Sequence, residues 1–107
     1  MQHIQDTAFG HTDLTRAEVE QRPGTALLVF GTDWCGHCQA AAAPLTQALV
    51  QHPGVHCVRV EDGPGRPLGR SFKVKLWPTL VWLRDGQEVA RVVRPTTTDE
   101  VLRLLAQ

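Results

Sequence analysis

One continuous apolar run constrains the fold of this chain more than any other feature. The run is TALLVFG, at residues 25–31, and its five central residues are all apolar. Such a run is typical of a strand that is covered on both faces in a parallel or mixed sheet. Because the 107 residues are 42% hydrophobic, they suit one compact domain with its own core. We therefore expect residues 1–107 to form a single domain, built in layers around this strand.

The segments around this strand alternate between helical and extended patterns. Thr12 or Asp13 is placed to cap a first helix, Pro44 is expected to kink the second, and Asp85 with Gly86 is the usual turn pair of a hairpin. The elements that we expect are a helix at 13–22, a strand at 25–31, a helix at 35–52, a second buried strand at 55–61, a short helix at 68–72, a hairpin at 79–93 and a capped helix at 96–107. This order predicts an α/β fold, with one mixed central β-sheet and helices on both faces.

Charge excludes some classes of partner. Lysine plus arginine equals aspartate plus glutamate, with 11 of each, so no general attraction to nucleic acid or anionic lipid is expected. The amino end has no basic start followed by an apolar core, and no apolar run is long enough to cross a bilayer. We therefore expect no nucleic-acid partner, no membrane partner and a cytoplasmic location. A periplasmic location is expected only if a leader has been removed.

Two of the three cysteines form a close pair where the central strand meets the following helix. Cys35 is expected at or just before the amino end of that helix, and Cys38 lies one turn further in, close enough for a disulfide. The free amides and the dipole at that end should lower the pKa of the Cys35 thiol, and a protonated His37 adds a positive charge. Gly36 keeps the approach to the sulfur open. Cys38 is suited to resolving a mixed disulfide by attacking Cys35.

The cysteines have other interpretations. Three cysteines are too few, and odd in number, for the disulfide framework of a small secreted domain. A CxxC pair can be half of a zinc site, but a structural zinc site needs four ligands, and there is no second CxxC or helical HxxxH pair. We therefore expect neither a metal nor a cofactor. Cys57 is most simply a small buried hydrophobic residue, and Trp82 a packing residue of the hairpin.

The stretch WCGHC after LLVF, with WPTLVWLRDGQEV downstream, resembles the thioredoxin superfamily from about Phe9 to Ala106. The resemblance implies a thioredoxin fold in which Pro78 is a cis-proline that faces the cysteine pair. It also implies that the backbone of Trp77 pairs with an extended substrate, beside Trp34 on the surface. Gly-His between the cysteines is the dipeptide typical of protein disulfide isomerase domains. The implied substrate-binding residues are Trp34, Gly36, Trp77 and Pro78.

The chain departs from this family at three positions. Val29 stands where thioredoxins carry a buried aspartate that helps to move the proton of the resolving thiol. We match Cys57 to the lysine that pairs with this aspartate in many thioredoxins, so that the pair is replaced together. We match Pro95 to the glycine that follows the hairpin. These departures put recognition of the usual thioredoxin partners in doubt.

The resemblance implies a thiol-disulfide oxidoreductase that serves cell redox homeostasis and electron transport. Cys35, Cys38 and His37 would be catalytic, and the partners would be protein disulfide substrates and an unidentified thiol or reductase as electron donor. We expect a monomer. The alternative is a non-catalytic peptide-binding module of the same fold, which would hold its partner on Trp34, Trp77 and Pro78.

Overall fold

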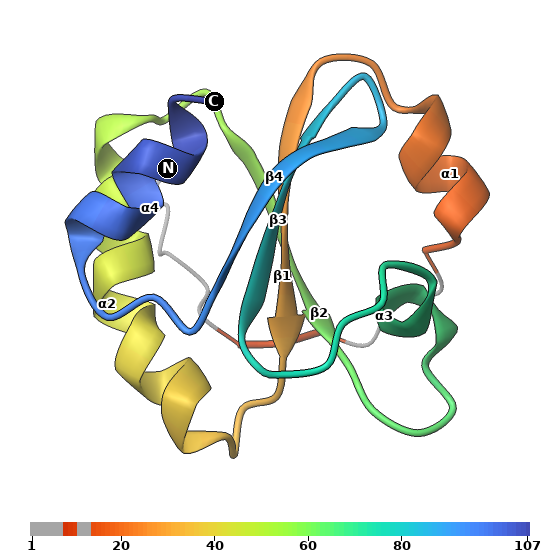
Figure 1. The fold of residues 1–107 in the computed structure, drawn as a ribbon, viewed down its shortest axis with the longest axis horizontal. Helices are drawn as coiled ribbons and strands as arrows, with labels where there is room; N and C mark the ends of the chain where they lie inside the picture. The colour runs from red at the N-terminus through yellow and green to blue at the C-terminus, as the bar shows by residue number, and fades with distance from the viewer. Residues whose placement is uncertain (1–7, 11–13) are drawn as a thin grey trace, which may run out of the picture.

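The central strand predicted from the apolar run lies inside a four-stranded sheet (Figure 1). The computed structural model describes residues 8–10 and 14–107. Its elements, in chain order, are α1 (Arg16–Gln21), β1 (Thr25–Gly31), α2 (Gly36–Gln51), β2 (His56–Glu61), α3 (Pro67–Ser71), β3 (Thr79–Arg84), β4 (Gln87–Val93) and α4 (Thr98–Leu105). The strand order is β2-β1-β3-β4, and β1 pairs parallel with β2 and antiparallel with β3. The predicted α/β fold with a mixed sheet is confirmed.

Helices cover both faces of this sheet (Figure 1). Because side chains alternate along a strand, Leu27 and Val29 of β1 pack toward α2 and α4, whereas Leu28 and Phe30 pack toward α1 and α3. All four side chains are at most 2% exposed. The buried residues of the α2 and α4 face include Leu45, Leu49, Leu80, Trp82, Val101 and Leu104. Trp82 is therefore a packing residue, as predicted.

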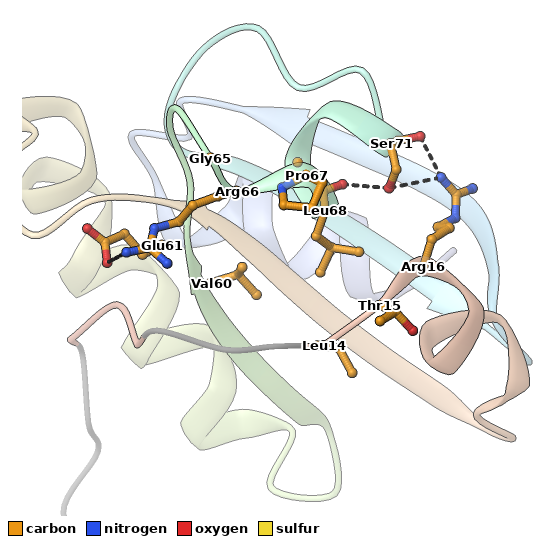
Figure 2. Close-up of a pocket in the computed structure, with 11 residues that line it drawn as sticks. Leu14, Thr15, Arg16, Val60, Glu61, Gly65, Arg66, Pro67, Leu68 and Ser71 are labelled. Atoms are coloured by element: carbon orange, nitrogen blue, oxygen red, sulfur yellow. Dashed lines mark hydrogen bonds and ion pairs between the residues drawn. The ribbon is translucent and has the colours of Figure 1, made fainter.

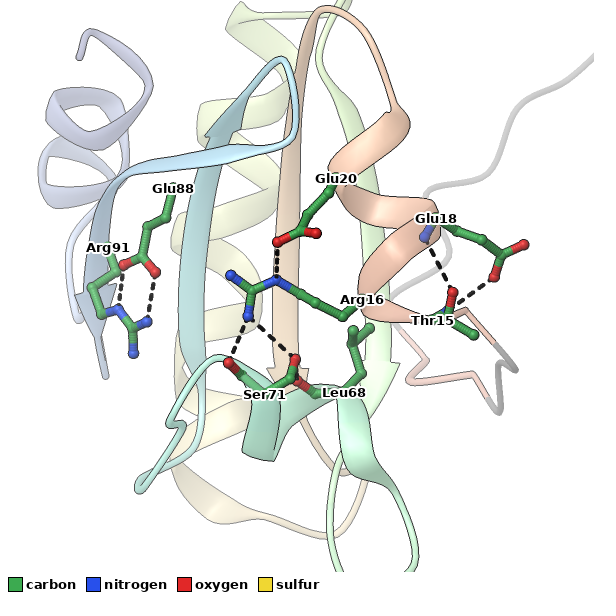
Figure 3. A network of polar contacts seen from close by, with 8 residues as sticks. All are labelled: Thr15, Arg16, Glu18, Glu20, Leu68, Ser71, Glu88 and Arg91. Carbon is green, nitrogen blue, oxygen red and sulfur yellow. Dashed lines mark hydrogen bonds and ion pairs between the residues drawn. The ribbon is translucent and has the colours of Figure 1, made fainter.

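On the face of the sheet that α1 and α3 cover, Arg16 connects these two helices (Figure 3). Its guanidinium lies 3.8 Å from the ring centroid of Phe72, donates to the Ser71 carbonyl and pairs with Glu20. A cation over an aromatic face is stabilising, and more so where water is partly excluded. Next to this contact, a pocket of about 300 Å³ opens between α1, β2 and α3, with Leu68 in its lining (Figure 2).

Local signals in the sequence explain where most elements begin and end. Asp85 and Gly86 have φ angles of 51° and 80°, as a two-residue hairpin turn requires. Thr97 caps α4 with a capping box. The first helix differs from its prediction: it begins at Arg16, because Thr15 forms a capping box of its own. The predicted caps, Thr12 and Asp13, lie outside the described residues.

The strand predicted at 55–61 is present as β2, but it is less buried than expected. In the described part of the chain β2 is at one end of the sheet, and only Val60 is fully buried. A single bridge from Gly10 to Val60 adds cover on its outer side. The prediction of a second buried strand is therefore wrong, because β2 has a neighbouring strand on one side only. No described helix is both long enough and apolar enough to cross a membrane.

Candidate redox site

The cysteine pair lies where β1 ends and α2 begins. Cys35 is the N-cap of α2, and Cys38 is the third residue of this 16-residue helix. Both are free thiols and both are buried, at 9% and 6% exposed. The backbone N–H groups of Cys38 and His37, in the first turn of the helix, act on the Cys35 sulfur. The predicted placement of both cysteines is confirmed.

Gly31, the last residue of β1, makes room for the deeper thiol. A Cβ at this position would lie 2.5 Å from the Cys38 sulfur and 2.9 Å from the Cζ of Phe9. Side-chain carbon atoms do not come so close to other atoms without displacement. The sulfur of Cys38 therefore occupies, together with the Phe9 ring, the space that a side chain at Gly31 would need.

The electrostatics of the site favour the Cys35 thiolate. Burial alone would raise the pKa of Cys35, but hydrogen bonds from the Cys38 backbone, the Cys38 thiol and the His37 backbone outweigh it. The charge of Arg94 acts in the same direction, and the net result is a pKa below the ordinary cysteine value. A thiolate is the nucleophile in disulfide exchange, so Cys35 is prepared to attack.

The same surroundings keep Cys38 protonated. Burial, together with the hydrogen bond and charge of the neighbouring Cys35, raises the pKa of Cys38 to about 12. The backbone N–H of Thr32 and the charge of Arg94 oppose this shift without reversing it. The two thiols therefore differ in the way that a nucleophile and a resolving thiol should differ.

The segment before β3 completes the site. The Trp77–Pro78 peptide bond is cis, as the resemblance implied, and the Trp77 carbonyl oxygen lies 4.0 Å from the Cys35 sulfur. The Trp77 indole donates to Asp62 at 2.8 Å, and its ring meets Trp34 edge-on with centroids 5.8 Å apart. Trp34 is 72% exposed, so this pair of rings forms an apolar surface beside the cysteines.

Sequence reasoning missed Arg94, which follows β4. Its Nε donates to the Trp77 carbonyl at 2.8 Å, and its backbone N–H donates to the Pro78 carbonyl at 2.9 Å. Arg94 also has a φ of 53°, the left-handed region that favours glycine. Proline cannot adopt this φ. The position after the hairpin whose backbone suits a glycine is therefore Arg94. The match of the family's glycine to Pro95 is wrong. The signal in the sequence that could have identified Arg94 was its place directly before Pro95, at the end of the predicted hairpin.

The match of Cys57 to the lysine that pairs with the residue at position 29 stays a prediction. In the parallel register of β1 and β2, the partner of Val29 is Arg59, and the partner of Cys57 is Leu27. Val29 is 2% exposed and belongs to the core, so no carboxylate stands there. The position beside it keeps a cation in Arg59. Cys57 is half-buried against the core of the α2 and α4 face, and burial raises the pKa of its thiol.

The remaining predicted residues lie at the rim of the site. His37 is exposed, and its contribution to the pKa of Cys35 comes from its backbone N–H. Gly36 is exposed as well, and a Cβ there would meet no atom within 4 Å. Roles for the His37 imidazole and for Gly36 stay predictions. Over residues 8–10 and 14–107, no three His, Cys, Asp or Glu side chains gather as metal ligands would.

Comparison with known proteins identifies the relatives of this chain. The model of the thioredoxin family matches residues 7–107. The chain is 31% identical over 85 residues to a thioredoxin of Chlamydia trachomatis, and the match covers 78% of this chain and 82% of that protein. It is also 32% identical over 83 residues to protein disulfide-isomerase A3 of Gallus gallus, but this match covers 77% of the chain and only 16% of that protein.

Among solved structures, the chain is similar to thioredoxin 2 from Pseudomonas aeruginosa PAO1 in its reduced form. The TM-score is 0.85 and the identity 49%, with 95% of this chain and 94% of that one covered. The mixed sheet, the cysteine pair at the start of α2 and the facing cis-proline define a protein of the thioredoxin fold with a CxxC redox motif. The chain belongs to the thioredoxin family.

Proposed function

We propose that this chain is a thiol-disulfide oxidoreductase that exchanges disulfides with protein substrates through Cys35 and Cys38. One observation carries the proposal: the pKa of Cys35 lies below its ordinary value, whereas that of Cys38, one helical turn away, is raised to about 12. Such a contrast in pKa distinguishes an attacking thiolate from a resolving thiol that stays protonated until the mixed disulfide has formed. The family membership of the chain supports the same activity.

The reaction follows from these two protonation states. The Cys35 thiolate attacks one sulfur of the substrate disulfide, a mixed disulfide forms, and the other substrate sulfur leaves as a thiolate that takes up a proton. Cys38 then loses its proton and attacks the Cys35 sulfur. The Cys35–Cys38 disulfide forms, and the second substrate sulfur leaves. Two electrons have passed from the dithiol to the substrate, and an electron donor, a thiol or a reductase, must return them.

Trp34, Trp77 and Pro78 are the proposed contacts for the substrate. Trp34 offers an exposed ring beside Cys35, and the backbone carbonyl of Trp77 faces the Cys35 sulfur. An extended segment that pairs with this backbone would carry its disulfide to the thiolate. A monomeric working state and a cytoplasmic location stay predictions.

Reduction of a disulfide-bonded protein tests the proposal. We expect Cys35→Ser to abolish turnover and Cys38→Ser to trap a mixed disulfide, whereas Cys57→Ser should behave as the wild type does. An equilibrium titration against glutathione and dithiothreitol buffers should show one two-electron transition, in which a tenfold change in the equilibrium constant is about 30 mV. Turnover by Cys35→Ser, or no reversible transition, would refute the proposal.

The exposed Trp34 ring favours one alternative, a binding module of the same fold without catalysis. Such a module should hold a partner peptide with unchanged affinity after Cys35→Ala and Cys38→Ala. An oxidoreductase should lose its reaction with either change, so the two functions can be distinguished with the same pair of variants.

A further inference from the structure

Arg94 places a fixed positive charge at the substrate side of the cysteine pair. Its backbone N–H donates to the Pro78 carbonyl and its Nε donates to the Trp77 carbonyl, so both the backbone and the guanidinium of Arg94 are fixed in position. The Nη groups of the guanidinium have no hydrogen-bond partner among residues 8–10 and 14–107. The four N–H donors of the two Nη groups therefore remain available to a ligand, in a group that stays charged at any physiological pH.

The guanidinium of Arg94 lies close to the position that a substrate disulfide would occupy beside Cys35. The Trp77 carbonyl that accepts from Arg94 is the same carbonyl that faces the Cys35 sulfur. Arg94 also favours the thiolate of both cysteines, which shows that its field reaches the reacting atoms. A substrate group that follows or precedes the disulfide would thus meet a guanidinium with free donors.

A second group of cations is connected to Trp77 through Asp62. A pocket of about 460 Å³ is lined by Asp62, Gly63, Arg66, Arg70, Lys73, Val74 and Lys75. Asp62 connects this pocket to the site, because its carboxylate accepts from the Trp77 indole. Arg66 pairs with Glu61, whereas Arg70, Lys73 and Lys75 make no ion pair within the described part of the chain.

Two carboxylates near the site accept hydrogen bonds from neutral donors, which do not remove their negative charge. Asp33 accepts from the Phe9 backbone at 2.9 Å, and Asp62 accepts from Trp77. Other acidic residues lie away from the site, for example Glu20 on α1 and Asp99 on α4, both in ion pairs. Around the pocket and Trp77 the cations outnumber the carboxylates by five to three, which gives a locally positive potential; they are Arg66, Arg70, Lys73, Lys75 and Arg94 against Asp33, Glu61 and Asp62.

We propose that Arg94 and the pocket of Arg70, Lys73 and Lys75 select a disulfide partner whose cysteine is flanked by carboxylates, in an acidic polypeptide segment. One cationic group is bonded to the Trp77 carbonyl and the other is connected to the Trp77 indole through Asp62. A polypeptide can reach both groups at once, which a small disulfide cannot do as well. The selection rests on the proposed exchange reaction. Opposite charge raises the rate of encounter, and Arg94 binds a carboxylate beside the disulfide through its free Nη groups.

The test compares three disulfide-bonded peptides of one length, with Glu, Gln or Lys on both sides of the cysteine. We expect kcat/KM of the reduced protein to be about tenfold higher for the Glu peptide than for the Lys peptide at low ionic strength, at the low end of electrostatic steering. The preference should shrink at about 1 M salt, where the screening length is about 3 Å. Reduction of the Gln peptide should change little with salt.

Variants connect this preference to the named residues. Arg70→Gln with Lys75→Gln should reduce the preference for Glu and leave reduction of the Gln peptide within about twofold. Arg94→Gln should slow reduction of all three peptides, because Arg94 also favours the Cys35 thiolate, and it should in addition lower the ratio of the Glu rate to the Lys rate. Arg94→Lys keeps the charge and should retain part of the preference. Arg103→Gln removes one exposed cation from α4 and is the matched control, with no expected change.

The outcomes separate this inference from the proposed function. If no peptide is reduced, the exchange reaction itself is refuted. If the Gln peptide is reduced but the Glu and Lys peptides react equally, or if Arg94→Gln keeps the full preference, selection by these cations is refuted. If Arg94→Gln, relative to its effect on the Gln peptide, slows reduction of glutathione disulfide as much as that of the Glu peptide, the site takes a small carboxylate disulfide, and the polypeptide is refuted.

Discussion

The contrast between the two thiols predicts how each reacts with an alkylating reagent. At pH 7 an ordinary cysteine of pKa 9.0 is about 1% thiolate, whereas Cys38, with a pKa of about 12, is about 0.001% thiolate. The thiolate fraction of Cys38 is thus about a thousandfold below that of an ordinary cysteine. The pKa of Cys35 is lowered, so its thiolate fraction lies above the ordinary value. We expect iodoacetamide to modify Cys35 first by a wide margin.

Variants that retain one thiol assign each rate to one cysteine, and burial, the largest cause of the raised Cys38 pKa, remains when Cys35 is replaced. Cys38→Ser with Cys57→Ser leaves Cys35, and Cys35→Ser with Cys57→Ser leaves Cys38. The rate of alkylation is followed by mass spectrometry between pH 5 and pH 11, with the unfolded protein in denaturant as control. Poor access alone would slow Cys38 at every pH, so the pH dependence decides: its rate should still be rising at pH 11. An inflection for Cys38 near pH 9, or one for Cys35 above it, would refute the reasoning.

Two further predictions concern stability, measured by urea unfolding. Gly31→Ala places a Cβ 2.5 Å from the Cys38 sulfur and should destabilise the fold by about 1–3 kcal/mol, whereas Gly36→Ala meets nothing within 4 Å and should stay within about 0.5 kcal/mol of the wild type. Equal effects of the two changes would contradict the packing argument. Thr97→Ala removes the capping box of α4 and should cost about 1 kcal/mol, while Thr97→Ser should retain most of the stability.

Much of the fold could be predicted because its signals are local. The apolar run of β1, the Asp85 and Gly86 turn and the cap of α4 each depend on residues that are neighbours in the sequence. The first helix was placed too early because two other residues near its start are also good caps, and only the structure shows the reciprocal bonds of Thr15 and Glu18. The exposure of β2 could not be predicted, because it depends on the order of strands in the sheet.

The site divides in the same way. The cysteine pair and the cis-proline could be found because their spacing and the residues around them are themselves the motif. Arg94 and Asp62 were missed because each reaches the site through Trp77, from a segment 17 or 15 residues away. That Arg59 lies directly opposite Val29, with Cys57 two residues away on the same face, could not be predicted, because a register between two strands cannot be read from one strand.

The structure also bears on how Cys38 loses its proton when position 29 carries no carboxylate. Four influences set the pKa of Cys38: burial, the Thr32 backbone N–H, the Cys35 sulfur and the charge of Arg94. When Cys35 enters a mixed disulfide, its negative charge is gone, and with it one of the causes that raise this pKa. The Thr32 N–H and Arg94 continue to favour the Cys38 thiolate. Attack on the substrate therefore itself makes Cys38 more acidic, so the second step is favoured only after the first has occurred.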